Sequence, residues 1–267
     1  MISTRALDTS VTGTRGRVSN AIQLAASRTG VDFGYLFNQA RVESSLDPNA
    51  RARTSSATGL FQFIDQTWLA TVKRHGAAHG LGWAAGAIQR GGNGRFHIAD
   101  PATRHAVMEL RKNPEAASAM AAEFAADNQE YLEGRLGRSA EPVDLYLAHF
   151  LGPAGAARFL SAHDASPDAP AAALLPQAAR ANRTIFYDRS GSARSFAEIR
   201  ERFAAKIGGP STSPSQRIGP PPLILDMPTV RLATMRAEES GRGSAPAAGP
   251  APQYARLAYL MLAQLGG

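Results

Sequence analysis

The chain has 267 residues, of which 44% are hydrophobic, so it has enough apolar material for a buried core, and wholesale disorder is excluded. It contains no cysteine, which excludes disulfides and thiolate metal sites. The formal net charge of +7 favours an anionic partner, such as nucleic acid, an anionic membrane surface or a cell-wall polymer that carries carboxylates. Because the basic residues are scattered, a solvated basic surface explains the charge equally well.

The N-terminal segment, residues 1–25, mixes Thr, Ser, Gly and Arg with short apolar stretches. It lacks the apolar segment of a secretory signal, and no run of about 18 apolar residues occurs that would span a membrane. We therefore expect no transmembrane helix. If the protein acts outside the cytoplasm, its export route is not visible in this sequence.

Most of the chain shows helical signals. Asp32 is expected to cap a helix that ends near residues 43–45, and Asp65 to cap a second helix that stops near Gly76. The glycine-rich stretch at residues 80–94 predicts an irregular loop.

Later helix starts are marked by a proline in the first turn, where the missing N–H costs no hydrogen bond: Pro101, Pro114, Pro142 and Pro153. Ser195 and Glu198 form a capping box for a last helix, which closes at Gly208. Residues 209–252 are rich in proline, serine and glycine and predict a linker, and residues 253–267 predict a short terminal helix. The sequence thus predicts a mainly α protein with one helical domain over residues 26–208.

Glu43 is the strongest candidate for a catalytic acid. It lies at the predicted end of a helix whose other positions are largely apolar. The negative end of the helix dipole and the apolar surroundings both disfavour a charged carboxylate there, so the neutral acid is favoured. A protonated carboxyl group in a cleft is what a glycosidic oxygen needs in order to leave. A glutamate at a helix end is, however, also commonly a solvent-facing residue.

The sequence around Glu43 favours the chemical interpretation. Glu-Ser-Ser-Leu-Asp-Pro-Asn-Ala at residues 43–50, a Ser/Thr-rich loop and Gly-Leu-Phe-Gln-Phe at residues 59–63 resemble the signature of the soluble lytic transglycosylases. These belong to glycoside hydrolase family 23, which also contains goose-type lysozyme, and the closing segments resemble those of phage and alphaproteobacterial members. The resemblance implies a lysozyme-like helical fold and cleavage of the β-1,4 bond between N-acetylmuramic acid and N-acetylglucosamine.

The resemblance also implies the roles of individual residues. The matching glutamate, Glu43, would protonate the leaving oxygen and then act as a base on the C6 hydroxyl of the same muramic residue, giving a 1,6-anhydro product. A single carboxylate suffices for that reaction, unlike the pair that ordinary glycosidases use. Gln62 and Phe63 fall on the substrate-binding motif, and Ser55 or Ser56 stands where the family has a sugar-contacting serine. The loop before Gln62 is one residue longer than in common members.

A second segment, Leu147–Pro153, lies where the family has Ala-Tyr-Asn-Ala-Gly. His149 replaces the usual tyrosine and Phe150 the usual asparagine, so the implied sugar contacts at that subsite are altered. Tyr146 or Tyr187 is then an alternative source of a hydroxyl group. The resemblance covers roughly residues 30–205.

Different classes of function stay open at this point. A hydrolytic muramidase would need Asp47 or Asp65 to hold a water molecule, and a non-catalytic glycan-binding component of a phage tail or envelope-spanning machine would need neither. A nucleic-acid binder is disfavoured, because the sequence has no basic cluster interleaved with aromatics. His75 and His79 are four residues apart but have no third ligand nearby in the sequence, so we expect neither a metal nor another cofactor. The expected partner is peptidoglycan in the periplasm, and the C-terminal tail is a candidate for binding a protein.

Overall fold

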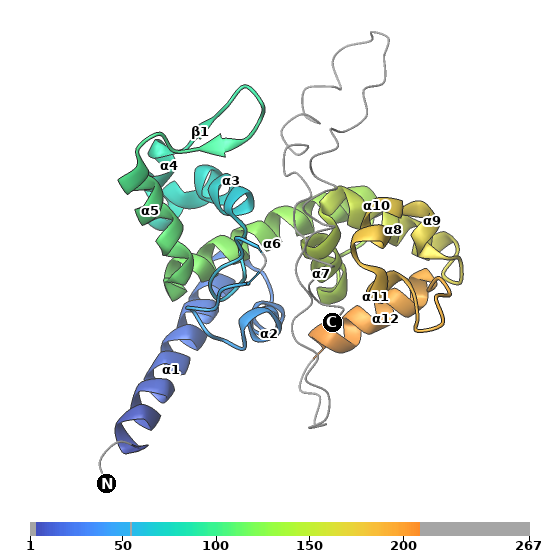
Figure 1. Cartoon of the computed structure of the whole chain (residues 1–267), viewed down its shortest axis with the longest axis horizontal. Helices are drawn as coiled ribbons and strands as arrows, with labels where there is room; N and C mark the ends of the chain where they lie inside the picture. The colour runs from blue at the N-terminus through green and yellow to red at the C-terminus, as the bar shows by residue number, and fades with distance from the viewer. Residues whose placement is uncertain (1–3, 54, 209–267) are drawn as a thin grey trace.

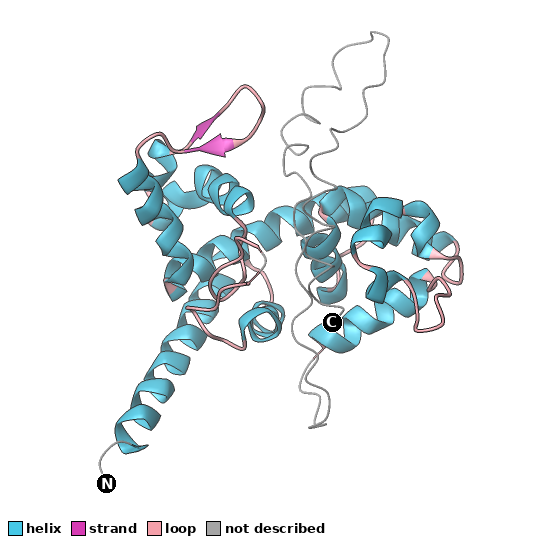
Figure 2. Ribbon diagram, in the orientation of Figure 1, coloured by secondary structure: helices cyan, strands magenta, loops and turns pink. Residues whose placement is uncertain are grey.

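The computed structural model describes residues 4–53 and 55–208 of the chain (Figure 1). The predicted linker and terminal helix at residues 209–267 lie outside this part. Figure 2 shows that helices dominate the described residues and that strands are confined to one short hairpin. The predicted mainly α fold is therefore confirmed.

The helices and strands follow one another in chain order. Their bounds are α1 (Thr4–Thr29), α2 (Phe33–Ser44), α3 (Asp65–His75), η1 (Gly76–His79), α4 (Gly82–Ala87), β1 (Gln89–Arg90), β2 (Phe96–His97), α5 (Pro101–Glu109), η2 (Leu110–Lys112), α6 (Pro114–Leu136), α7 (Pro142–Leu151), α8 (Pro153–Ala165), α9 (Ala171–Leu174), α10 (Pro176–Ala181), α11 (Arg183–Phe186) and α12 (Phe196–Ile207).

Helix α6 crosses the middle of the molecule and joins its two halves (Figure 1). It packs against α1 and α3 on one side and against α7 and α8 on the other. Its buried face is rich in small side chains, including Ala117, Ala121 and Ala125, and these let neighbouring helices approach closely. Asn113 caps this helix, its side chain accepting the N–H of Ala116.

Helix α1 was not predicted. It extends from Thr4 to Thr29 and packs against α6 and α2, so the expected boundary after residue 25 falls inside it. Its described buried side chains include Val18, Ile22, Ala25 and Ala26, which recur at helical spacing. The weak apolar signal of this segment and its internal Gly13 and Gly16 explain why sequence patterns alone did not reveal the helix.

Two predictions in the first half were wrong. Residues 80–94 are not an irregular loop: they contain α4 and part of a hairpin in which Gln89 pairs with His97 and Arg90 with Phe96. Asp65 is not a cap but the first residue of α3, which follows Ile64. The Asp65 side chain instead binds two arginines, so a long-range ion pair has replaced the local cap.

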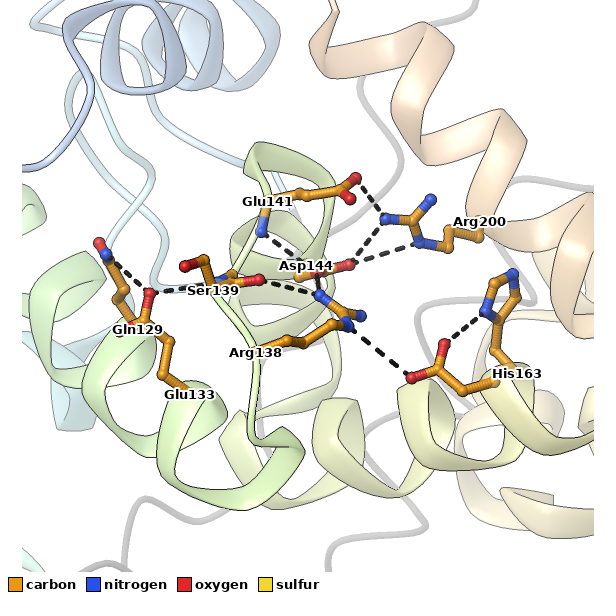
Figure 3. Close-up of polar contacts among 10 residues, drawn as sticks. Gln129, Glu133, Arg138, Ser139, Glu141, Asp144, His163 and Arg200 are labelled. Carbon is orange, nitrogen blue, oxygen red and sulfur yellow. Dashed lines mark hydrogen bonds and ion pairs between the residues drawn. The ribbon is translucent and has the colours of Figure 1, made fainter.

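The proline-marked helix starts and the Ser195–Glu198 capping box are all confirmed. Helix α12 folds back so that it packs against α2, α7 and α8. Arg200 of α12 binds Glu141 and Asp144 at the start of α7 (Figure 3). This contact brings the end of the domain beside the end of α2. In the part of the chain described, no helix is both long enough and apolar enough to cross a membrane.

Candidate active site

The site is built on the last turn of α2. Asp32 caps the start of this helix by accepting the N–H of Tyr35, and Ser45 ends it in the left-handed conformation, with φ of 56°. The Ser44 hydroxyl donates to the carbonyl of Leu60 as well as to that of Ala40. This bond ties the end of α2 to the loop that carries the second sequence motif.

Gly59 of that motif has a physical reason to be glycine. Its φ is +82°, and a Cβ built there would lie 1.9 Å from the carbonyl oxygen of Arg111. Arg111 in turn is buried and donates to the carbonyls of Ser56 and Phe63 and to the Asp65 carboxylate. The loop at residues 55–63 is therefore fixed by close contact with η2, where any larger residue in place of Gly59 would collide with backbone.

Glu43 lies at the centre of the arrangement. It is 5% exposed and points toward α7. The Tyr146 hydroxyl donates to Glu43 Oε1 at 3.2 Å, and His149 Nε2 lies 3.6 Å from the same oxygen. The second distance exceeds that of a hydrogen bond. One carboxyl oxygen is thus turned inward against two groups of α7.

The other carboxyl oxygen of Glu43, Oε2, lacks such contacts in the part of the chain described. Oε2 has no hydrogen-bond partner in the described residues, and it is not among the buried polar atoms that lack one. Among the described residues, then, the protein holds Oε1 and makes no hydrogen bond to Oε2.

The other ring nitrogen of His149, Nδ1, contacts a buried glutamine of α2. Gln39, one turn before Glu43 on α2, places its Nε2 3.2 Å from His149 Nδ1. Two atoms of this pair, Gln39 Oε1 and His149 Nε2, are buried without a hydrogen-bond partner among the described residues. Unsatisfied buried polar atoms are rare in folded proteins and frequently mark functional sites.

The phenols and the lysine around Glu43 have perturbed acidities. Burial raises the pKa of Tyr146, and the Glu43 carboxylate beside it adds to the rise. Burial and the same carboxylate also raise the pKa of Tyr35. Both hydroxyl groups therefore keep their protons and remain donors at neutral pH. Burial lowers the pKa of Lys206 on α12, although Glu43 opposes this, and its Nζ lies 5.4 Å from the centre of the Tyr146 ring.

The residues expected to bind substrate through the first motif lie in different settings. Gln62 is buried with φ of 48°, and its amide nitrogen donates to the carbonyls of Ala50 and Gly59. Phe63 is buried against the Trp68 and Phe124 rings. The Ser55 hydroxyl accepts the N–H of Ala57, and the exposed Ser56 accepts that of Asp65. These contacts are internal, and a sugar contact by any of the four remains a prediction.

The residues expected to bind substrate through the second motif also lie in different settings: some face Glu43 and others do not. Tyr146 and His149 both face Glu43, and their rings stack with centres 5.9 Å apart. Phe150 instead packs on Phe203 of α12, at 5.1 Å. Tyr187 lies at the end of α11 beneath the guanidinium of Arg183, and no contact joins it to Glu43 in the described part of the chain. Of the two candidate hydroxyl donors, Tyr146 is the one next to the carboxylate.

The candidate second carboxylates are engaged elsewhere. Asp47 is exposed and accepts the N–H of Asn49 within a turn, and Asp65 pairs with Arg104 and Arg111. His75 and His79 form ion pairs with carboxylates of α6, His75 with Glu123 and Asp127 and His79 with Glu123. Among the described residues, no cluster has the arrangement of three or more ligands that a metal ion needs.

The comparison with known families bears directly on this carboxylate. Residues 20–81 match the family model of the transglycosylase SLT domain. The SLT segment, as we call these residues, contains α2, Glu43 and the Gly59–Phe63 motif. Its family supports a transglycosylase-type function and a peptidoglycan substrate, and the helical fold agrees with a lysozyme-like domain.

The SLT segment ends before the other half of the site. Tyr146 and His149 come from α7, and Lys206 from α12, all outside the match. The residues next to Glu43 that lie on these later helices are therefore placed by the structure and not by the family match.

Sequence analysis missed several residues of the site: Tyr35, Gln39, Arg111 and Lys206. A signal for Gln39 existed, since it precedes Glu43 by four residues and so shares its helix face. Tyr35 lies a further turn back on the same face. Arg111 and Lys206 carried no local signal, because their roles depend on contacts with elements distant in sequence.

Proposed function

We propose that this protein is a peptidoglycan lytic transglycosylase that cleaves the β-1,4 bond between N-acetylmuramic acid and N-acetylglucosamine. Glu43 acts as the single general acid and base. The observation that carries the proposal is the unequal environment of the two Glu43 oxygens: Oε1 accepts a hydrogen bond from Tyr146, while no described residue bonds to Oε2. The SLT family match at the same residue supports the substrate class.

The reaction follows from one carboxyl group used twice. Glu43 gives the proton on Oε2 to the glycosidic oxygen, and the bond from that oxygen to C1 of the muramic residue breaks. The resulting carboxylate then removes the proton of the C6 hydroxyl of the same sugar, and a bond forms between O6 and C1. The products are a 1,6-anhydromuramic end and a free N-acetylglucosamine hydroxyl, and Glu43 is protonated again. No water is consumed.

The surroundings of Glu43 suit both steps. The Tyr146 phenol, whose pKa is raised, stays a donor to Oε1 and stabilises the carboxylate formed in the first step. The described contacts of Glu43 include no carboxylate that would position water on the opposite face of a sugar, as an inverting hydrolase needs. We place this activity in the cell envelope, where murein is found.

The deciding experiment is the structure of the product. Purified murein is digested with the full chain and the soluble fragments are analysed by mass spectrometry. Anhydromuramic ends are expected from the wild type and no fragments from Glu43→Gln. Reducing ends in place of anhydro ends would replace the proposal by a hydrolytic muramidase.

Two further measurements test for a second catalytic carboxylate and for binding without cleavage. Asp47→Asn should leave product and rate unchanged, because Asp47 forms only a turn at the surface. Loss of fragments in Asp47→Asn would assign a catalytic carboxylate outside our proposal. Murein that is bound but never cleaved by the wild type would instead identify a non-catalytic glycan-binding protein.

A further inference from the structure

The buried pair formed by Gln39 and His149 has a role that the reaction described above does not use. We propose that Gln39 fixes the tautomer of His149 so that its Nε2–H bonds to Glu43 Oε1 only after Glu43 has given up its proton. His149 is then a positioning residue that acts through Glu43. The inference rests on the proposed function, since it assigns a task within that reaction.

The tautomer follows from the donor chemistry of the pair. An amide nitrogen can only donate a hydrogen bond, and Gln39 Nε2 lies 3.2 Å from His149 Nδ1. Nδ1 must therefore accept, which places the proton of the neutral imidazole on Nε2. That nitrogen faces Glu43 Oε1 at 3.6 Å.

The donor on Nε2 is unsatisfied in the resting protein. It is buried, it has no hydrogen-bond partner among the described residues, and its distance from Oε1 is slightly too long. An unpaired buried donor raises the free energy of the resting state. A shortening of well under 1 Å would pair it, and a negative charge on the carboxylate supplies the attraction that draws the two groups together.

The charge on Glu43 appears as the glycosidic bond breaks. A hydrogen bond made only at that stage lowers the barrier without tightening substrate binding. Such bonds are often long in a free enzyme and shorten in the reacting complex. His149 would thus join Tyr146 on Oε1 when the proton leaves from Oε2.

Of the groups around Glu43, His149 is the one suited to form this additional hydrogen bond. Tyr146 already donates to Oε1, and the Tyr35 hydroxyl makes no hydrogen bond to the carboxylate. Lys206 faces Glu43 from α12 over the ring of Tyr146 but forms no ion pair with the carboxylate. His149 is the group whose unpaired Nε2 lies 3.6 Å from the oxygen that becomes charged.

Steady-state kinetics on sonicated murein test the proposal. We compare the wild type with His149→Phe, which keeps a ring but has no N–H, and with His149→Gln, which keeps an amide donor. His149→Phe should lower kcat about 10- to 100-fold with KM changed less than about twofold. His149→Gln should recover part of that loss. The matched control is His163→Phe on α8, whose ring pairs with Asp164, and its kinetics should equal those of the wild type.

A kcat for His149→Phe equal to that of the wild type would overturn the proposal. So would an equal loss in His149→Phe and His149→Gln when thermal melts show that both variants are folded. A rise in KM alone would assign His149 to sugar binding instead. These outcomes differ from failure of the proposed function, in which the wild type itself releases no fragments from murein.

The tautomer is tested without any substrate. Histidine-ring nitrogen NMR on the full chain, with the His149 signal identified by its absence in His149→Phe, shows which nitrogen carries hydrogen. A proton on Nε2 is expected in the wild type, and a mixture of both tautomers in Gln39→Met, which cannot donate to Nδ1. A wild-type proton on Nδ1 would overturn the assignment whatever the kinetics show.

Discussion

Two carboxylates of this domain, Asp144 and Glu43, are both buried but are bonded very differently. Asp144, at the start of α7, has a fully buried side chain that meets Arg138 at 2.7 Å and Arg200 at 3.1 Å (Figure 3). It also accepts the N–H of Glu141. Glu43, at the end of α2, accepts one hydrogen bond of 3.2 Å and leaves a neighbouring donor unpaired.

Under the proposed function, this difference separates a structural carboxylate, Asp144, from a catalytic one, Glu43. Asp144 has charge-assisted bonds to two cations, so its charged form is compensated and fixed in place. Those bonds join α7 to α12 and thereby position the helices that carry Tyr146, His149 and Lys206. Glu43 lacks such compensation, so it can exchange a proton without dismantling a network. Incomplete satisfaction costs stability at Glu43 and leaves it free to react.

The largest expected effect is on catalysis. Glu43→Gln should reduce release of murein fragments about 10³-fold or more, because the amide cannot donate a proton to the leaving oxygen. Its free energy of unfolding, measured in urea, should be close to that of the wild type, since the amide keeps the shape of the neutral acid and its oxygen can still accept from Tyr146. A Glu43→Gln protein that loses both activity and several kcal/mol of stability would abolish the contrast with Asp144.

Asp144→Asn should show the opposite pattern. Two arginines are left facing a neutral amide, and a loss of about 3 to 5 kcal/mol in the free energy of unfolding is expected. The matched control is Asp164→Asn, since Asp164 is half-exposed and lies 3.8 Å from Arg138. That change should cost under about 0.5 kcal/mol. Similar losses in the two variants would mean that burial of the pair contributes little.

A smaller effect is expected for the hydroxyl that holds Oε1. Tyr146→Phe should lower the rate of fragment release about tenfold, which corresponds to one hydrogen bond to a carboxylate formed during the reaction. Tyr35→Phe is the control, because the Tyr35 hydroxyl makes no such bond in the described residues. If both variants lose rate equally, the bond at Oε1 is not the cause.

The smallest effect is expected for Asp127, a carboxylate that is paired like Asp144 but less buried. Burial alone would raise the pKa of Asp127 on α6, but the hydrogen bond and charge of His75, together with Arg74, outweigh it and hold this pKa below its ordinary value. A lowered folded-state pKa stabilises the protein above the unfolded value of about 3.9, and this stability is lost as pH falls through the folded value.

Asp127→Asn should therefore remove about 1 kcal/mol of stability at pH 7 and flatten the fall in unfolding free energy toward acid. Urea unfolding at several pH values measures both. Glu130→Gln, an exposed neighbour on the same helix, should leave the wild-type pH dependence intact. A wild-type slope retained in Asp127→Asn would assign the acid sensitivity to other carboxylates.

Local sequence signals were sufficient for the features that depend on a few adjacent residues. Caps at Asp32 and Ser195 marked helix starts correctly, because a side chain and the N–H groups it accepts lie within one turn. Glu43 was found from its motif and its place at a helix end. Asp65 was misassigned as a cap, because contacts with Arg104 and Arg111 claimed its carboxylate.

The sequence by itself determined the helical class and most helix starts after α1, which follow from local hydrogen bonding and apolar spacing. It also indicated the candidate acid, through the resemblance of the motif around Glu43 to a known family. Only the tertiary structure decided which oxygen of Glu43 is held and which is open, and that Gln39 lies against His149. Those relations join residues more than a hundred positions apart, and they exist because α12 packs against both α2 and α7 while side chains of α7 contact α2. No local pattern encodes which side chains such packing leaves unpaired.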